Sequence, residues 1–336
     1  MLISFFCFIQ CKKNDAIEIV DIKKSVDLNI ERFDKLYAVA TPKTLPELKN
    51  QYPFLFPTQF PDSIWYAKLN DPIFKELNVE VSKQFPDNSK IEDDLEMLVS
   101  RIKYYFPEEK TPRVITLVNE VLIDKKAFYT NDLILISLDT YLGKNHKFYE
   151  PFTEYQKANL EPHQILPDLV TNFAYRKIVP SQDKTLISEM IYYGKLHYLK
   201  DLLLPETPNY QKIGYTAIQE KFCMENEFQM WSYLVDEKLL YDNNIKNYQR
   251  FIEDGPFTKF YLEIDRESPG RIGQWLGWQI VKSYMENNEV TLDQLLKTEP
   301  IVIFNKSKSK GLKITYDFNE IIDSSYYIIT VPTPID

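Results

Sequence analysis

Three histidines, His146, His163 and His197, are the residues of this sequence best suited to hold a transition metal. A helix-borne zinc site needs two imidazoles four residues apart on one face, with an adjacent glutamate to act as base on the metal-bound water. The three histidines lie too far apart in the sequence for any two to share a helical turn. We therefore expect no bound metal and no cofactor, while a site in which the three histidines converge in space stays open.

Two later segments nevertheless have the layout of a zinc peptidase of the gluzincin type. In such enzymes one helix carries the histidine pair, and a second helix carries a glutamate ligand in a phrase similar to Ser188-Glu-Met-Ile-Tyr-Tyr-Gly-Lys195. Glu189 matches that glutamate, whereas the preceding segment, His163 to Tyr175, lacks the histidine pair. Glu189 is thus either a relic of a metal site or an ordinary helix carboxylate in a salt bridge, and His163 is a candidate beside it.

A phrase between Glu267 and Met285 contains three glycines at steps of three and four residues. On a helix they form a bare stripe on which another backbone can lie closely, and each costs about 1 kcal/mol relative to Ala, so a packing contact must compensate. The alternative is a helix that forms the floor of a ligand cleft. We expect Trp275 and Trp278 to anchor the core or line that cleft, and Arg271 to meet an anionic group near the helix start.

The N-terminal residues have the pattern of a secretory signal that ends in a lipidated cysteine. An apolar run, Leu2 to Ile9, precedes Cys11 and is too short to span a bilayer. Bacterial lipoproteins carry their lipid on such a cysteine, so Cys11 is the predicted lipidation site, and a buried N-terminal strand is the alternative. Cys7 falls within the signal, and Cys223 alone remains in the body, so no internal disulfide is expected.

The composition indicates a globular protein that does not bind nucleic acid. The chain has 336 residues, 44% of them hydrophobic, which is enough to bury a large core in two lobes. Its 40 Lys and Arg residues against 49 Asp and Glu residues give a formal net charge of −9. That balance argues against a general electrostatic affinity for DNA or RNA.

Hydrophobic periodicity predicts an α+β fold with a small mixed sheet followed by a mainly helical lobe. After an amphipathic helix at 91–106, β-rich runs between 114 and 138 predict neighbouring strands. From Pro162 onward the pattern is almost wholly helical, with helices expected at 162–178, 184–204, 216–242, 245–254, 270–288 and 291–297. The predicted organisation is a signal and lipid anchor at 1–11, a tether at 12–45, a sheet-bearing lobe at 46–150, a helical lobe at 151–300 and a β-rich C-terminal tail at 301–336.

A set of longer phrases is more specific in combination than any single motif. These phrases are Phe54 to Pro61 with Trp65, Tyr104 to Pro107 with Pro112 to Thr116, Leu133 to Gly143, Met190 to Lys195, Leu202 to Pro205, Asp254 to Thr258 and Ser268 to Met285. Together they resemble the GldB family of gliding-motility lipoproteins. The resemblance implies a membrane-attached component needed for surface gliding and for the linked type IX secretion pathway. It also implies a zincin-like two-lobe fold that lacks the metal ligands.

The leading hypothesis is a lipid-anchored, non-catalytic scaffold or adaptor in the cell envelope, with its body outside the cytoplasm, in the periplasm. It would contact the membrane through its N-terminal lipid and have protein partners in the gliding and secretion machinery. One rival is a hydrolase with an unrecognised site in the cleft between the lobes, using Glu189 with Arg271 or nearby carboxylates. Another is a binding module for peptide or glycan that uses an aromatic cleft near Trp275 and Trp278.

Overall fold

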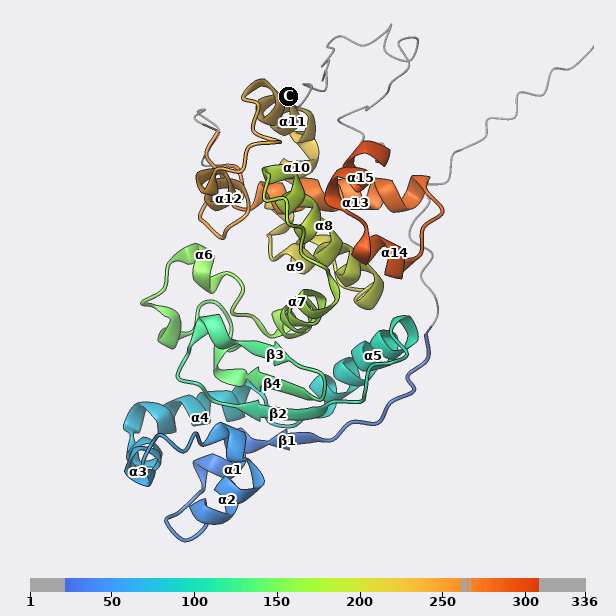
Figure 1. Cartoon of the computed structure of the whole chain (residues 1–336). Coiled ribbons are helices and arrows are strands. Elements are labelled where there is room, and N and C mark those ends of the chain that lie inside the picture. Colours follow the sequence, from blue (N-terminus) through green and yellow to red (C-terminus); the bar gives the residue numbers. More distant parts are fainter. Residues whose placement is uncertain (1–21, 261–264, 266, 308–336) are drawn as a thin grey trace, which may run out of the picture.

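The structure is a computed structural model that describes residues 22–260, 265 and 267–307, and its first half is built around a four-stranded mixed sheet (Figure 1). The spatial order is β1-β2-β4-β3, with β1, β2 and β4 parallel and β3 antiparallel to β4. The central strands are rich in Ile, Leu and Val, as expected of parallel strands covered by helices. The strands are β1 (Ile30–Arg32), β2 (Arg113–Leu117), β3 (Ala127–Tyr129) and β4 (Leu133–Ser137).

Five helices precede the second strand in the sequence. The best-defined start is that of α4, where Asp71 accepts hydrogen bonds from the backbone N–H groups of Ile73 and Phe74 and Pro72 occupies the first helical turn. Helix α5 buries Leu95, Leu98 and Ile102 on one face, as its amphipathic pattern predicts. These helices are α1 (Phe33–Ala38), α2 (Leu45–Gln51), α3 (Asp62–Asn70), α4 (Pro72–Gln84) and α5 (Ser89–Tyr105).

The second half of the described chain is helical. The capping boxes predicted at Thr216 with Gln219 and at Thr291 with Gln294 are both formed, and each starts a helix. The helix predicted over 216–242 is divided in two at Asn226. The helices are α6 (Glu154–Lys157), α7 (Ile165–Lys177), α8 (Leu186–Leu203), α9 (Asn209–Ile213), α10 (Ala217–Glu225), α11 (Glu227–Asp236), α12 (Ile245–Phe251), α13 (Ile272–Asn287), α14 (Leu292–Lys297) and α15 (Pro300–Lys306).

Short 3-10 helices connect several of these elements. They are Pro53–Leu55, Ile123–Lys125, Leu138–Thr140, Lys147–Tyr149 and Pro162–Gln164. The last of them leads directly into α7.

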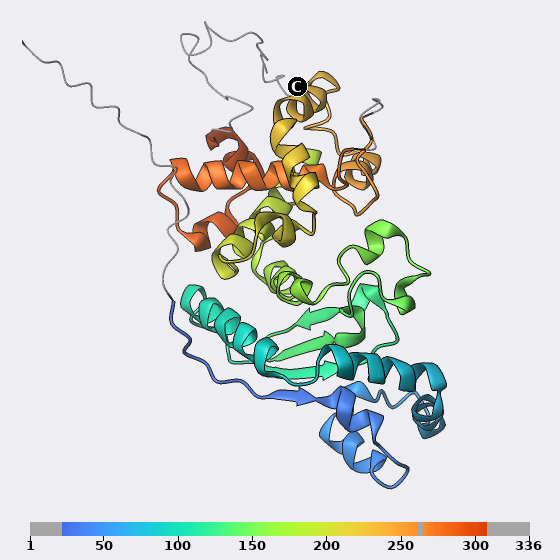
Figure 2. The ribbon, with the colours of Figure 1, turned by 180° about the vertical axis from the view of Figure 1, so that it is seen from behind.

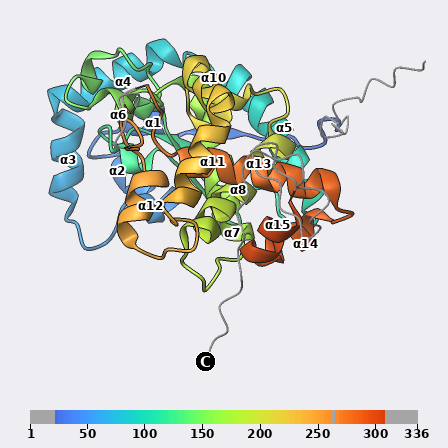
Figure 3. The same ribbon diagram turned by 90° about the horizontal axis from the view of Figure 1, so that it is seen from above.

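Helix α8 joins the two halves, because opposite faces of it enter two hydrophobic cores. Leu196, Leu199 and Leu203 pack in the core that contains the sheet, whereas Ile187 and Met190 pack in the core of the helical half. Helix α7 lies between the sheet and α8, as seen from the front and from behind (Figures 1 and 2). Seen from above, the helical half lies over the sheet (Figure 3).

Helices α8 and α13 cross at two glycines, and no side chain separates them there. A Cβ added at Gly194 would overlap the backbone of Gly277, and a Cβ at Gly277 would overlap the carbonyl of Met190. A Cβ at Gly273 would lie 2.8 Å from the carbonyl oxygen of Phe251. The close helix packing predicted from the glycine spacing is confirmed.

The α+β class and the order of a small mixed sheet followed by helices are confirmed, but two boundaries differ from the prediction. Leu28 and Ile30 are buried, and Ile30 of β1 pairs with Val114 of β2, so residues 28–45 belong to the folded body and not to a tether. Residues 300–306 form α15, where a β-rich tail was expected from 301. The rest of that tail, at 308–336, and the predicted anchor at 1–11 lie outside the described residues.

Candidate functional site

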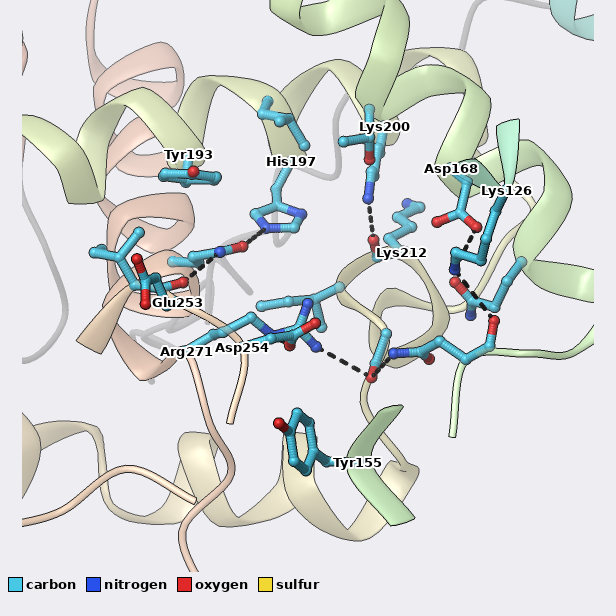
Figure 4. Close-up of a pocket in the computed structure, with 18 of the residues that line it drawn as sticks. Lys126, Tyr155, Asp168, Tyr193, His197, Lys200, Lys212, Glu253, Asp254 and Arg271 are labelled. Carbon is cyan, nitrogen blue, oxygen red and sulfur yellow. Dashed lines mark hydrogen bonds and ion pairs between the residues drawn. The ribbon is translucent and has the colours of Figure 1, made fainter. Parts of the chain in front are cut away.

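A polar cavity of about 500 Å³ lies where loops of the sheet-bearing half meet the helical half (Figure 4). Its walls come from α7, α8, α9, the end of α12 and the start of α13, together with the segments 123–126 and 155–160. The polar and charged residues that line it are Asp124, Lys126, Tyr155, Gln156, Asn159, Gln164, Asp168, Thr171, Tyr175, Tyr193, His197, Lys200, Lys212, Tyr248, Glu253, Asp254, Arg271 and Gln274.

Helical spacing explains how two helices present polar groups to one space. On α8, Tyr193, His197 and Lys200 follow one another at steps of four and three residues, which places them on one face. On α7, Asp168 and Thr171 are three residues apart and face the same cavity. The other faces of α8 are committed to the two hydrophobic cores, so this polar strip is what remains for a ligand.

Lys200 lies deep in the site. Its side chain is only 5% exposed, and its Nζ donates a hydrogen bond to the backbone carbonyl of Lys212 at 2.6 Å. Burial is the main cause that lowers the pKa of Lys200 to about 7; the nearby cations Arg271, Lys126 and Lys212 contribute to this shift, and Asp168 opposes it. The amine therefore exchanges its proton near neutral pH.

His197 is also buried, and the hydrogen bonds around it fix its tautomer. The side-chain amide of Gln274 donates from Nε2 to the carbonyl of Ile252 at 2.8 Å, so its Oε1 faces His197 Nε2 at 3.0 Å and accepts the ring proton. The Nδ1 atom then carries a lone pair, and it is buried without a hydrogen-bond partner. Burial holds the pKa of His197 well below its usual range, so the ring is neutral.

Three charged residues at the cavity, Lys126, Asp168 and Arg271, are held in ion pairs. Lys126 Nζ lies 2.7 Å from Asp168 Oδ2, which also accepts a hydrogen bond from the hydroxyl of Tyr141 at 2.8 Å. Arg271 Nε lies 2.7 Å from Asp254 Oδ1. Arg271 has a left-handed backbone with φ of 60° at the N-cap of α13, which directs the chain from the loop into the helix.

A buried carboxylate holds the wall behind the cavity. Asp201 of α8 accepts a hydrogen bond from Lys212 Nζ at 2.8 Å and another from the indole Nε1 of Trp278 at 2.7 Å. Lys282 Nζ lies 3.4 Å from the same carboxylate and 3.8 Å from the centre of the Trp278 ring. Asp201 therefore ties α8 to both α9 and α13 and keeps the cavity wall in place.

Of the residues singled out from the sequence, Arg271 and His197 line the cavity. Trp275 and Trp278 are buried in the core of the helical half and do not line the cavity. Glu189 is outside the lining and pairs with Lys184 at 3.2 Å.

His163 also lies outside the cavity lining, and burial lowers its pKa. Cys11 falls outside the described residues. Among the described residues, no group of three His, Cys, Asp or Glu side chains has the arrangement needed to hold a metal ion.

The sequence reasoning missed Lys200 and did not place His197 in a polar site. The signal that identifies them is the strip Tyr193, His197 and Lys200, at steps of four and three residues on a largely apolar helix. Lys126 and Asp168 carried no comparable signal, because they are brought together only by the packing of α7 against the sheet.

Within the described ranges, no helix combines the length and the apolar character needed to cross a membrane.

Comparison with known proteins gives one match. No curated protein and no solved structure matches the chain. The model of one protein family, described as gliding motility protein GldB, matches residues 12–311, which is most of the sequence and includes every wall of the cavity. The chain therefore belongs to the GldB family of gliding-motility lipoproteins and is involved in gliding motility.

Proposed function

We propose that this chain is a lipid-anchored, non-catalytic component of the gliding apparatus that binds a small ligand in the cavity between α7, α8 and α13. The observation that carries the proposal is a cavity of about 500 Å³ lined by a buried lysine and by a histidine whose Nδ1 has no hydrogen-bond partner. Ligand sites are typically cavities of roughly 300 to 1,000 Å³ with a few fixed polar groups. This proposal combines the hypothesis of a peptide- or glycan-binding module with a role in gliding.

The geometry favours binding over hydrolysis at this place. The rival hydrolase was expected to use Glu189 with Arg271 or nearby carboxylates, and of these two named residues Arg271 lines the cavity and Glu189 does not. Asp168 and Asp254, two of the carboxylates that line the cavity, are held in ion pairs with Lys126 and Arg271. A degenerate zincin-like ancestry remains part of the proposal, supported by the likeness of the phrase around Glu189 to a gluzincin helix.

The proposed anchor is a lipid on Cys11, with the body in the periplasm. Support comes from the family name, which denotes a lipoprotein, and from the apolar run before Cys11. An anchor with more than one acyl chain gives lasting attachment to a membrane. Replacement of Cys11 by Ser should release the protein into the soluble fraction of lysed cells. Continued sedimentation of the variant with membranes would contradict the anchor.

The proposal extends to the type IX secretion pathway that is linked to gliding. Cells that lack this chain should then lose both surface movement and the release of secreted cargo into the medium. Normal cargo release in non-gliding mutant cells would restrict the role of the protein to motility.

Two neighbouring residues of α7 offer a matched test of the cavity. Thr171 and Asn172 each donate a hydrogen bond to the carbonyl four residues earlier in the same helix, at 2.9 Å and 3.0 Å, and both are half-buried. Thr171 lines the cavity, whereas Asn172 does not. Thr171→Phe should fill part of the cavity and stop colony spreading, while Asn172→Phe should spread normally.

The test is made in cells that lack the native copy, with equal amounts of each folded variant verified by immunoblot and circular dichroism. If cells with folded Thr171→Phe glide as well as wild-type cells, the cavity is not needed and the binding function is rejected.

A further inference from the structure

Lys200 differs from the other cations of the cavity in its partners. Lys126, Lys212 and Arg271 each lie in an ion pair, with Asp168, Asp201 and Asp254 respectively. Lys200 forms no ion pair with any described residue, and its one hydrogen bond goes to the neutral carbonyl of Lys212. A protonated lysine has three N–H donors, so two remain for a partner that enters the cavity.

His197 supplies the complementary group on the same face of α8. It precedes Lys200 by three residues, so both side chains project into the same part of the cavity (Figure 4). Its unpaired Nδ1 is an acceptor, because the proton is on Nε2 and is bonded to Gln274. A buried acceptor without a donor destabilises the free protein, and a ligand N–H or O–H group would supply the missing hydrogen bond.

We propose that the cavity binds a small carboxylate ligand that has an N–H or O–H donor next to the carboxylate, and this rests on the proposed binding function. The carboxylate lies at Lys200, and the neighbouring donor bonds to Nδ1 of His197. Two kinds of molecule have this chemistry: a peptide C-terminus, whose last amide N–H is adjacent to the carboxylate, and a sugar acid, whose hydroxyl is adjacent to it.

Size and lining agree with such a ligand. A volume of about 500 Å³ accommodates a few peptide residues or sugar units. Tyrosine rings are rigid, largely apolar surfaces with a polar tip, and they suit both peptide and sugar contacts. Four of them line the cavity, Tyr155, Tyr175, Tyr193 and Tyr248.

Electrostatics makes proton uptake part of binding. The charged groups that act on Lys200 are Asp168 from α7, Arg271 before α13, Lys126 before β3 and Lys212 from α9, so cations outnumber carboxylates. At pH 8 the amine, whose pKa is about 7, is mostly neutral. A bound carboxylate favours the charged form and raises the pKa, so each binding event should take up a proton from solution.

The first experiment is calorimetric titration of the full chain in detergent at pH 8, in two buffers that differ in ionisation enthalpy. The probes are matched pairs: N-acetyl-dialanine and its C-terminal amide, and glucuronic acid and glucose. We expect one acid to bind about tenfold or more tightly than its neutral partner, with net proton uptake. Binding of the peptide acid or of the sugar acid identifies the source of the carboxylate.

Two buried lysines of α8 provide the variant and its control. Lys200→Met keeps the bulk of the side chain and removes the amine, and it should lower acid affinity about tenfold or more and abolish proton uptake. Lys195→Met also removes a buried amine, one that donates to the carbonyls of Leu296 and Thr298 at 3.3 Å and 2.7 Å and does not line the cavity. It should bind the acid as the wild type does.

Three results would overturn the inference: equal affinity for an acid and its neutral partner, no binding of either acid, or unchanged acid binding by Lys200→Met. If Lys200→Met does not fold, the proton uptake of the wild-type chain decides, because binding without uptake excludes Lys200 as the carboxylate partner. Loss of gliding in Thr171→Phe cells, together with failure of both acids to bind, would reject the carboxylate ligand and leave the proposed binding function in place.

Discussion

Replacement of Gly277 by Ala tests the contact that holds the helical half together. The new methyl group would point from α13 into the carbonyl of Met190 on α8, closer than the 3.0 Å that real Cβ atoms keep from their neighbours. The neighbour is backbone, so it cannot rotate away as a flexible side chain would. The two helices must separate or tilt, and that disturbs the packing of the core side chains on both.

The expected size of the effect comes from two opposing terms. Overpacking of a well-packed core costs about 1 to 3 kcal/mol and occasionally more, and a clash with backbone belongs at or above the upper end. Ala is favoured over Gly within a helix by about 1 kcal/mol, which offsets part of that cost. We expect a net loss of about 2 kcal/mol or more in the free energy of unfolding, or a fall in Tm of about 3 °C or more for a chain of this size.

The assay is guanidinium denaturation followed by tryptophan fluorescence, since Trp275 and Trp278 lie on the same helix. Gly255→Ala is the matched control, because its added Cβ would meet only the carbonyl oxygen of Phe257, at an ordinary 3.8 Å. The control should change stability by less than about 1 kcal/mol. Unchanged or increased stability of Gly277→Ala would refute the close crossing of α8 and α13.

Three further predictions concern charge and metal. Asp201→Asn should lower the free energy of unfolding by about 3 kcal/mol, because the ammonium groups of Lys212 and Lys282 then lose their buried carboxylate. The control Asp254→Asn removes an exposed carboxylate and should cost less than about 1 kcal/mol. Equal small losses for the two variants in urea denaturation would contradict this prediction. The pKa of Lys200 is lowered to about 7, so between pH 7 and 9 the unfolded chain binds the extra proton and stability should rise with pH, by about 2 kcal/mol relative to Lys200→Met. If the free energies of unfolding of the wild type and Lys200→Met change in parallel between pH 7 and 9, the lowered pKa of Lys200 is excluded. Elemental analysis of folded protein purified without chelator should find far less than one metal per chain, and about one equivalent would revive the peptidase hypothesis at Glu189.

Much of the fold follows from local patterns. The capping boxes at Thr216 and Thr291 mark helix starts because the hydrogen bonds that define them join residues three positions apart. The strands between 113 and 137 were predicted from β-rich runs, and the glycine spacing in α13 predicted a close helix contact. Each of these signals is written in residues that are neighbours in the sequence.

The elements that were misplaced depend on distant partners. Strand β1 has three residues, too few for a periodic signal, and it is a strand because Ile30 lies beside Val114 in the sheet. Glu189 shows the opposite error, since a phrase similar to a metal-binding helix predicted a site where the structure has a salt bridge to Lys184. Local similarity cannot specify which face of a helix meets a cavity.

The sequence by itself determined the family, the α+β class and the approximate bounds of helices α5, α7, α8, α12, α13 and α14, because local hydrogen bonding, sterics and hydrophobic period act between nearby residues. Only the tertiary structure decided the site. Lys200 has a pKa near neutrality because α7, α9 and α13 bury it and bring other cations close. His197 has an unpaired nitrogen because Gln274, from another helix, holds its proton on the opposite side of the ring. Burial and the direction of a side chain are properties of the packed chain, and no spacing along the sequence records them.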